Sequence, residues 1–481
     1  MSNKKSTEVD RKALKTGVWY FVSEILVRGI SFLCTPVFTR LLSKSVYGDV
    51  KTYESWLYLL NPILSLGIYN SIERARFDFR ERFDAYISSG IFMVLLLNVL
   101  LGLACFPFGN QLAYFLDCPK ELVAFIFLYT VFYTSILCVQ KRERQMFQCK
   151  NSVLLSVLSA VLPMLTSVIC VMRYKKFLND EQLVSLRILS FYVPVVFVGM
   201  AVTILAFARG KKLIDRSFWL YGLKFSSPFI LYSISMQVLN QSDKIMIKKL
   251  CGSDDAGIYA VATTVVYIMD VINNAVQGAW MPWMFEKLHL KEKRQVQAVW
   301  NMLLFGMGSI TWLIVMAAPE LIFFLGGSNY GAAVWLIAPM VTGSLIHFIT
   351  VGYTNVEKFY KKTGCAAAAS LCSMAVNLLL NYVFIARFGY RAAAYTTASS
   401  YFAAVVLHSL FMKKCNMEDV LPVRPTIFAI LFFACINFCM MSVYQMPFYV
   451  RWFAIFTVLT GMFVKNRKNL TAIISRKRER E

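Results

Sequence analysis

The sequence predicts an all-α integral membrane protein with about fourteen transmembrane helices, in the range of twelve to fourteen. Charged clusters interrupt the 481-residue chain at near-regular intervals and leave apolar stretches between them. These stretches run to about 18–25 residues, the length that a helix needs to cross a hydrocarbon core of about 30 Å. Hydrophobic residues make up 58% of the chain and charged residues 16%, with a mean hydropathy of +0.57. A backbone in lipid must satisfy its own polar groups, so each stretch is expected to be a helix.

The predicted helices share this apolar character, and the intervals between them leave no room for a sizeable soluble domain. They are 13–39, 46–70, 85–107, 121–140, 152–173, 188–208, 222–247, 256–283, 297–317, 332–353, 364–386, 391–411, 426–445 and 448–464. The polar N-terminal segment has no short apolar core followed by a small-residue cleavage site. We therefore expect no cleaved signal peptide.

The formal net charge of +23 would suit a nucleic-acid-binding protein, but its distribution indicates membrane topology instead. If the N-terminus is cytoplasmic, the cytoplasmic segments carry 34 Lys and Arg residues and the periplasmic loops 13. Three more, Arg28, Lys51 and Lys224, lie inside predicted helices. The positive-inside rule accounts for this bias, so we expect both termini in the cytoplasm and no nucleic-acid partner. The basic tail could also hold anionic lipid head groups.

Motifs for catalysis or metal binding are absent from the sequence. The twelve cysteines form no CxxC pair, and most lie in or near predicted helices, where they act as small hydrophobic residues. Cys105 and Cys118 flank one predicted periplasmic loop and could form a disulfide. The three histidines are widely scattered, and there is no P-loop, GxSxG or HExxH. We expect no metal site, no cofactor and no enzymatic activity.

An internal repeat indicates how the helices are organised. Residues 40–56 and 249–265 align without gaps at an offset of 209 residues. Each copy begins with a basic residue, crosses a short turn and enters the next helix through Gly48 or Gly257. A glycine after a short polar turn is also common at helix starts, which is the alternative explanation.

The repeat predicts three units in the chain. Both copies begin an odd-numbered pair of helices, so the two halves share one orientation. We expect a six-helix lobe at 1–210 and a pseudo-symmetric six-helix lobe at 211–412, around a central cavity. Two additional transmembrane helices and a basic cytoplasmic tail follow at 413–481.

Ionisable residues inside the predicted helices are the candidate functional residues. A charge at the bilayer centre costs about 2.5–3.5 kcal/mol on insertion scales, so it normally faces a cavity or a partner. Glu24 and Arg28 lie four residues apart on one face of the first helix. Lys51 and Glu54 lie three apart in the second. Each pair could also neutralise itself and join helices, whereas Lys224 has no nearby carboxylate and favours a cavity.

The seventh and eighth helices carry further polar clusters. The outer third of the seventh helix contains the sequence NQSDK at 240–244, and Asp270 precedes two asparagines at helical spacing in the eighth. Intramembrane charge is thus concentrated in the first, second, seventh and eighth helices. We expect the central cavity to lie between these four.

Two segments resemble bacterial polysaccharide repeat-unit flippases, the Wzx type within the multidrug/oligosaccharidyl-lipid/polysaccharide exporter (MOP) superfamily. The resemblance covers residues 10–80 and 215–290, and elsewhere it extends only to hydropathy and helix number. The matching elements are Arg-Leu-Leu at 40–42, Tyr-Gly at 47–48, Ser-Asp-Lys at 242–244, Gly-Ile-Tyr at 257–259, Pro228, Trp280 and Pro282.

The resemblance implies a flippase in the bacterial cytoplasmic (inner) membrane. It would move an isoprenoid-pyrophosphate-linked oligosaccharide to the periplasmic leaflet for O-antigen, capsule or exopolysaccharide synthesis, by ion-coupled alternating access. Pyrophosphate binds best to Lys and Arg in a partly desolvated cavity. The predicted substrate-binding cations are Arg28, Lys51, Lys224 and Lys244.

The resemblance also implies sugar contacts, a coupling ion and partners. Aromatic and amide side chains could hold the sugar, namely Tyr53, Trp56, Tyr69, Asn70 and Asn240. A proton or sodium gradient would drive transport, with Glu24, Asp243 or Asp270 as the titrating or ion-binding group. Membrane lipids, a polysaccharide polymerase and the chain-length machinery are the expected partners.

Three alternatives remain open from the sequence. A drug or metabolite exporter of the same fold is expected to have fewer cations and more acids in its cavity. A lipid II-type flippase shares the helix number and a cationic cavity. A polytopic polysaccharide polymerase or ligase usually carries a large periplasmic loop, which this sequence lacks.

Overall fold

The computed structural model describes residues 29–460 except Ser31, Phe147, Glu418, Ala454, Ile455, Val458 and Leu459. This part of the chain is almost entirely helical and has no β-strand, which confirms the all-α prediction. Its long helices are α2 (Lys44–Leu64), α4 (Phe83–Cys105), α6 (Lys120–Gln145), α7 (Cys149–Tyr174), α8 (Asp180–Gly210), α9 (Arg216–Cys251), α10 (Ser253–His289), α11 (Lys293–Met316), α13 (Val334–Phe359), α14 (Thr363–Phe388), α15 (Arg391–Lys414) and α16 (Val423–Met440).

Shorter helices connect them. They are α3 (Ile72–Asp78), α5 (Gly109–Leu116) and α12 (Ala318–Gly326), with 3-10 turns η1 (Ile68–Asn70), η2 (Arg80–Arg82), η3 (Phe106–Phe108), η4 (Ser328–Ala333) and η5 (Met441–Gln445). The second predicted helix therefore ends early. The chain turns at Leu66 and Gly67, whose φ angles are both +53°, before η1 begins.

The protein is a multi-pass membrane protein. Among the described residues, nine helices are long and apolar enough to cross a membrane. The helices α2, α9 and α15 are not among the nine, although each coincides with a predicted span. Of the predicted helix 13–39 only the end is described, and 448–464 is described in part. The number fourteen therefore stays a prediction.

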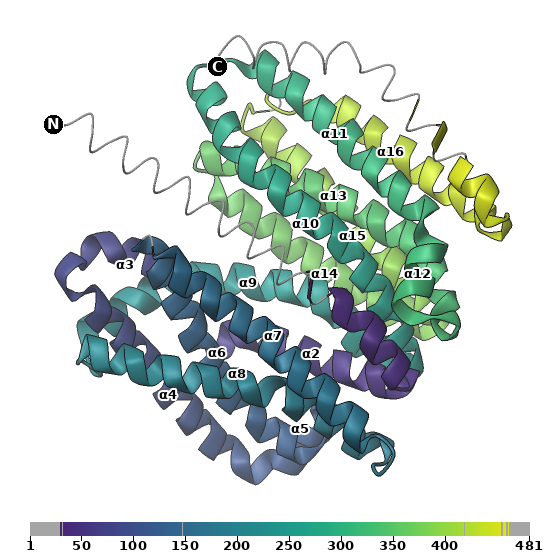
Figure 1. Cartoon of the computed structure of the whole chain (residues 1–481). Coiled ribbons are helices and arrows are strands. Elements are labelled where there is room, and N and C mark those ends of the chain that lie inside the picture. The colour runs from purple at the N-terminus through teal and green to yellow at the C-terminus, as the bar shows by residue number, and fades with distance from the viewer. Residues whose placement is uncertain are drawn as a thin grey trace.

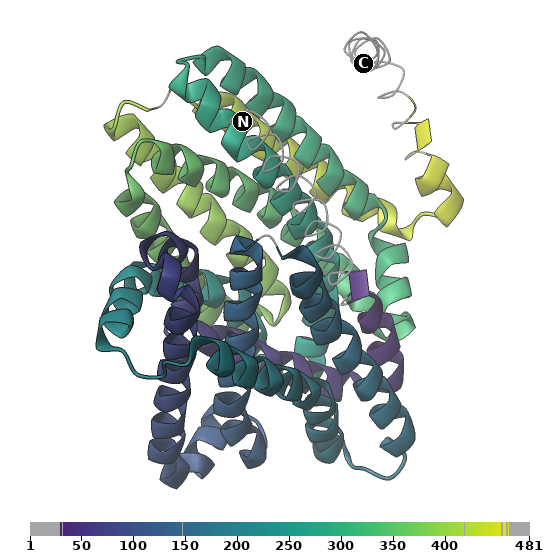
Figure 2. The same ribbon diagram turned by 60° about the vertical axis from the view of Figure 1, so that its left-hand side comes forward.

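The helices gather in two groups, with α9 between them (Figure 1). The blue helices α4 to α8 pack together with α2, and the green helices α10 to α15 form the second group, with α16 against α11 and α13. The view in Figure 2 shows the same separation. At the start of α9, Phe218 is buried in the cluster formed by Ile68 and Tyr86 of the first group. Near its end, Ser242 donates to Asn377 of α14.

One face of the molecule is rich in arginine, and we call it the basic face. The basic face comprises the helix ends near residues 82, 142, 209 and 215. The helix ends near residues 44, 120, 180 and 252 lie on the other side of the molecule, which we call the opposite face. Ion pairs join the helices at the basic face, among them Arg82–Asp215 at 2.9 Å, Arg142–Asp84 at 2.6 Å and Arg209–Glu143 at 3.5 Å. These pairs hold the start of α9 and the first group together.

Asp215 also begins α9. Its carboxylate accepts hydrogen bonds from the backbone N–H groups of Ser217 and Phe218, as an N-cap residue does. Hydrogen bonds from Lys212 and Ser217 hold the pKa of the Asp215 carboxyl well below its usual range. The cap explains why α9 begins six residues before the predicted start at 222.

A capping box likewise extends α8. The Asn179 side chain accepts from the backbone of Gln182, and the Gln182 side chain accepts from the backbone of Asn179. The helix consequently starts at Asp180, eight residues before the predicted start at 188. The predicted boundary was wrong because hydropathy alone does not detect a polar first turn, and the correction brings Arg187 into the helix.

Candidate functional site

Three cations surround one carboxylate where α2, α8 and α9 meet. Lys51 Nζ lies 2.7 Å from Glu54 Oε2, one turn along α2. The guanidinium of Arg187 on α8 lies 4.0 Å from Glu54 Oε1. Lys244 on α9 is buried, donates to Gln241 Oε1 at 2.8 Å and interacts electrostatically with Lys51 and Glu54. Lys244 also interacts electrostatically with the adjacent Asp243, so two carboxylates face three cations and this cationic cluster keeps an excess of positive charge.

Arg187 has unused hydrogen-bonding capacity within the cationic cluster. Its guanidinium carbon lies 3.9 Å from the ring centroid of Phe38 and 4.6 Å from that of Phe191. The residue is 4% exposed, and its Nε and Nη1 have no hydrogen-bond partner among the described residues. Buried donors without partners are costly, so they are well suited to an anionic ligand. The predicted site omits Arg187, and the capping box at Asn179 was the sequence signal that places it inside a helix.

The three cations lie at one depth. Lys51 is seven residues from the start of α2, Arg187 seven from the start of α8, and Lys244 seven from the end of α9. At 1.5 Å of rise per residue, each is about 10 Å below the opposite-face end of its helix. A charge inside the apolar layer of a membrane needs a partner or a polar ligand.

The other predicted cations and acids are Lys224, Glu24, Arg28 and Asp270. Lys224 is exposed, and the twenty residues of α9 between it and Lys244 span about 30 Å. The structure therefore does not bring Lys224 to the cationic cluster. Glu24 and Arg28 lie outside the described residues. Asp270 is half-buried on α10 and interacts electrostatically with Tyr267, which also interacts with Lys51 and Glu54.

The predicted sugar-contact residues are dispersed. Tyr53 is buried, and its hydroxyl donates at 2.9 Å to a backbone carbonyl of α6. Trp56 is buried against α5. Tyr69 and Asn70 lie in η1, where the Lys141 ammonium sits 5.6 Å from the Tyr69 ring centroid. Asn240 accepts a hydrogen bond from a tyrosine of α15. These five side chains do not form one surface.

Other tyrosines lie beside the cationic cluster. Tyr58 of α2 and Tyr267 of α10 both interact electrostatically with Glu54, and their exposed fractions are 44% and 47%. Tyr129 and Tyr133 of α6 stack at 5.2 Å next to them. Tyr58 could have been found from the sequence, because it follows Glu54 by four residues and so shares its helix face.

Asp243 is the centre of a second polar cluster, which faces α14 and α15. Its carboxylate accepts hydrogen bonds from Tyr259 of α10, from Asn381 at 2.7 Å and from Thr397 at 2.8 Å. Asp243 is 4% exposed, and the ammonium of the adjacent Lys244 donates to Gln241 instead. We call this group the Asp243 network. The sequence singles out Asp243, but its partners on α14 and α15 carry no signal of their own.

The Asp243 network and the cationic cluster share α9. Asp243, Tyr259, Asn381 and Thr397 lie six to eight residues from the opposite-face ends of their helices. That puts them about 9–12 Å below the opposite face, at the depth of the cationic cluster. Consecutive residues of α9 thus contribute to two clusters on different sides of the same helix.

The two helix groups make their closest contact at the opposite face. A Cβ on Gly48 of α2 would lie 1.9 Å from a backbone oxygen of α10, and a Cβ on Gly257 would lie 2.4 Å from one of α2. Lys248 at the end of α9 pairs with Asp49 of α2 at 2.9 Å. Arg40 donates at 3.0 Å to a backbone carbonyl of α12. The structure is therefore closed at the opposite face.

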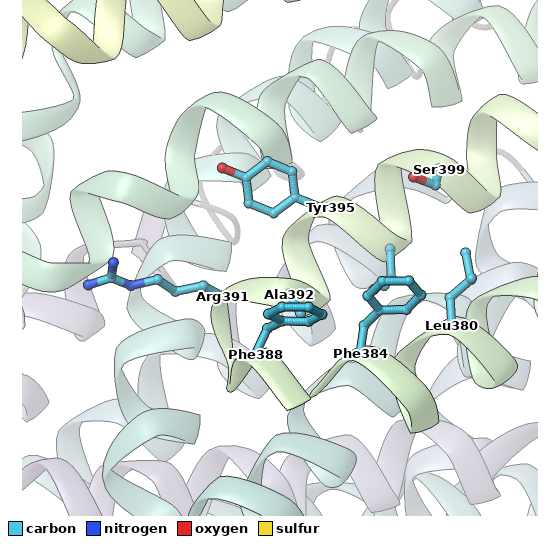
Figure 3. Close-up of a pocket in the computed structure, with 8 residues that line it drawn as sticks. Leu380, Phe384, Phe388, Arg391, Ala392, Tyr395 and Ser399 are labelled. Atoms are coloured by element: carbon cyan, nitrogen blue, oxygen red, sulfur yellow. The ribbon is translucent and has the colours of Figure 1, made fainter. Parts of the chain in front are cut away.

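A separate groove of ≈ 380 Å³ opens between α14 and α15 (Figure 3). Its lining is apolar and aromatic apart from Arg391 and two hydroxyl residues: Leu380, Phe384, Phe388, Arg391, Ala392, Tyr395, Thr396 and Ser399. No residue of α2, α8 or α9 lines it. The groove is thus distinct from the cationic cluster.

Comparison with known proteins places the chain in a family. Residues 13–288, more than half of the sequence, match the family described as "Polysaccharide biosynthesis protein". The chain is 24% identical over 359 residues to Lsg locus putative protein 1 of Haemophilus influenzae, covering 71% of this chain and 84% of that protein. It is 21% identical over 410 residues to a probable low-salt glycan biosynthesis flippase of Haloferax volcanii, covering 83% of each.

Solved structures share the fold. The lipid II flippase MurJ in an inward closed conformation superposes with a TM-score of 0.68 at 13% identity, covering 93% of this chain and 99% of that one. An inward-facing multidrug resistance MATE family transporter of the MOP superfamily gives 0.57 at 11% identity, with 88% and 99% covered. The fold is thus that of the MOP transporters. The segments 10–80 and 215–290 already resemble polysaccharide flippases, and the family match spans more than half of the sequence. The chain therefore belongs to the family described as "Polysaccharide biosynthesis protein".

Proposed function

We propose that this protein is a flippase that moves an isoprenoid-pyrophosphate-linked oligosaccharide from the cytoplasmic to the periplasmic leaflet of the bacterial inner membrane. The unit would serve O-antigen, capsule or exopolysaccharide synthesis. The observation that carries the proposal is the cationic cluster of Lys51, Arg187 and Lys244 around Glu54. The family description and the relative named as a probable glycan flippase support a glycan cargo.

The cationic cluster suits a pyrophosphate. Charge-assisted hydrogen bonds to phosphate are stronger than neutral ones, and the planar guanidinium of Arg187 can offer two parallel donors. Its Nε and Nη1 need partners, which phosphate oxygens would provide. The half-exposed faces of Tyr58 and Tyr267 offer aromatic surface for the adjoining sugar.

The closed opposite face defines the direction of loading. If the basic face is cytoplasmic, as the positive-inside rule predicts, the cargo head group reaches the cationic cluster from the cytoplasm. Separation of α2 from α10 at Gly48 and Gly257 would then release it to the periplasm, while the isoprenoid chain stays in lipid. This is alternating access between two similarly oriented helix groups.

Asp243 is our candidate for the ion-coupling residue, with Glu24 and Asp270 as the other acids. In the Asp243 network the carboxylate lies beside the hydroxyl groups of Tyr259 and Thr397, and carboxylate and hydroxyl oxygens are ligands that hard cations prefer. A proton or a sodium ion at Asp243 would change the charge next to Lys244. Because both residues are on α9, ion binding and cargo binding would act on the same helix.

The main alternative is a lipid II-type flippase, which the fold of MurJ favours. That cargo has the same isoprenoid-pyrophosphate chemistry, so the cationic cluster fits both. A drug exporter would be expected to carry an acidic rather than a cationic cluster. A polysaccharide polymerase or ligase has no observation in its favour.

Complementation tests the proposal. A strain that lacks its polysaccharide repeat-unit flippase, but keeps the remaining assembly genes, receives the wild-type chain or the triple variant Lys51→Ala/Arg187→Ala/Lys244→Ala. Surface glycan is measured together with protein level in membranes. We expect the wild type to restore glycan and the triple variant to fail. The control is Lys176→Ala, which removes an exposed cation between α7 and α8.

Three results would reject the proposal. Full glycan display by the triple variant would show that the cations only join helices. Rescue of a strain depleted of its lipid II flippase, without restored glycan, would favour the alternative cargo. Failure of the wild type to rescue several repeat-unit flippase deletions would reject glycan transport.

A further inference from the structure

A narrow cavity of ≈ 40 Å³ lies between α9 and the helices α13, α14 and α15 of the second group, with a wall of mixed polar and apolar side chains. Hydroxyl groups line much of it, contributed by Tyr232, Thr350, Thr354, Ser370, Ser373 and Tyr401. A polar cavity holds one water in roughly 10–15 Å³ of accessible volume, so this one has room for about three. Two of these hydroxyls donate to backbone carbonyls, Thr350 to Ile346 at 3.0 Å and Ser373 to Ser400 at 2.8 Å, and their oxygens can still accept hydrogen bonds from water.

One end of the cavity reaches the Asp243 network. The Tyr401 hydroxyl lines the cavity and donates to Asn240 Oδ1 at 3.2 Å, and Asn240 is one helical turn from Asp243 on α9. The His347 ring lies 4.8 Å from the Tyr401 ring, and His347 Nε2 is buried without a hydrogen-bond partner among the described residues. An unpartnered ring nitrogen at the cavity wall is a natural contact for water.

The other end reaches the basic face. Thr354 and Lys358 line the cavity in the last two turns of α13, which ends at Phe359, and Lys358 is exposed. Along α13, the cavity residues from His347 to Lys358 span eleven residues, or about 16 Å. The residues that line the cavity thus extend from Tyr401, which bonds to Asn240, to the end of α13.

None of the residues that line the cavity comes from α2 or α8. The cavity is therefore separate from the cationic cluster, which those two helices build with α9. Cargo bound at the cluster would leave the cavity open, so solution could reach Asp243 without passing the cargo.

We infer that this cavity is the route by which water and the coupling monovalent cation, a proton or sodium, pass between Asp243 and solution at the basic face. The inference rests on the coupling role proposed for Asp243. Cargo and coupling ion then use different entrances on the same face.

Thiol labelling tests the route without cargo or gradient. All twelve cysteines are replaced, and Thr350→Cys, Ser370→Cys or the native Cys372 is then introduced singly. Cys372 is the matched control, because it lies between Ser370 and Ser373 on α14 but is exposed on the outside of the bundle, where lipid lies. A membrane-impermeant methanethiosulfonate is added at the basic face of sealed vesicles.

We expect Thr350→Cys and Ser370→Cys to react at least about tenfold faster than Cys372, because only a hydrated thiol forms the reactive thiolate. Equal rates for cavity cysteines and Cys372 would overturn the route. The role of the route in transport is then tested by filling the cavity with a larger side chain. Thr350→Leu should reduce glycan export at least about fivefold. Thr350→Val has nearly the shape of threonine and keeps the cavity open, so it should retain most of the export. Unchanged export in Thr350→Leu would also overturn the inference.

The Asp243→Asn variant separates the two proposals. Lost export in Asp243→Asn with unreactive cavity cysteines would reject the route and leave the coupling residue in place. Normal, gradient-dependent export in Asp243→Asn would reject the coupling role, and the inferred ion route with it. Varying sodium at constant pH, and pH at constant sodium, identifies the cation in the wild type.

Discussion

Gly48 and Gly257 occupy reciprocal positions where α2 crosses α10. A Cβ on Gly48 would lie 1.9 Å from the Ser253 carbonyl oxygen, and a Cβ on Gly257 would lie 2.4 Å from that of Lys44. The two glycines are 209 residues apart in the sequence, and so are Lys44 and Ser253. The two copies of the repeat thus contact each other through equivalent residues, as a two-fold interface requires.

This contact gives the first prediction. Gly48→Ala or Gly257→Ala should prevent full closure of the opposite face, because real Cβ atoms do not approach backbone atoms so closely. We expect reduced glycan export and faster reaction of Cys251, at the end of α9, with an impermeant thiol reagent added to intact cells. Gly278→Ala is the control, since nothing lies within 4 Å of its Cβ position on α10. Wild-type export and labelling in both gate variants would contradict the closure.

Arg187 gives the second prediction. Arg187→Ala should weaken binding of a short-chain isoprenyl pyrophosphate by roughly 1.5–3 kcal/mol, or about 10- to 150-fold, the typical cost of a lost hydrogen bond to a charged group. Arg187→Lys should fall between wild type and alanine, because it keeps the charge but loses the planar pair of donors. Titration calorimetry of purified protein measures this, with Lys176→Ala as control. Equal affinity in wild type and Arg187→Ala would remove Arg187 from the site.

A buried pair in the second group gives the third prediction. His408 Nδ1 lies 2.8 Å from Glu357 Oε1, and both side chains are fully buried. His408→Leu should lower the free energy of unfolding by about 3–5 kcal/mol, because it leaves the Glu357 carboxyl buried without this partner. The double variant His408→Leu/Glu357→Leu should recover part of the loss. Thermal unfolding in detergent gives the comparison, and a Tm for His408→Leu within error of wild type would contradict it.

Asp215 gives the fourth prediction, at the basic face outside the membrane-spanning segments. Asp215→Ala removes the N-cap of α9 and should cost about 0.5–2 kcal/mol of stability at neutral pH. Since the pKa of this carboxyl is lowered in the folded protein, its stabilisation is present above its ordinary pKa and disappears as the pH falls through the folded value. The wild type and Asp215→Ala should therefore converge in Tm on acidification. A constant difference at all pH values would exclude the ionised carboxylate as the cause.

Hydropathy placed most of the helices because lipid imposes a length and an apolar character on every span. It failed at helix ends that begin with polar residues. The start of α8 depends on the hydrogen bonds between Asn179 and Gln182, and the start of α9 on those to Asp215. Such caps can be recognised from a few consecutive residues, but these residues lie outside the apolar stretch by which hydropathy identifies a helix. Arg187 was missed for this reason.

The sequence by itself determined the all-α membrane fold and the family, and it singled out the charged residues of α2 and α9 that the structure places in the two clusters. The spacing of apolar stretches and the composition are enough to predict these features, because both reflect the cost of placing polar groups in lipid. Only the tertiary structure decided which charges meet. It joined Arg187 to Lys51 and Lys244, left Lys224 about 30 Å along α9 from Lys244, and supplied Asp243 with Asn381 and Thr397. Helix packing brings these residues together across more than fifty positions of sequence, and no local pattern records a contact of that kind.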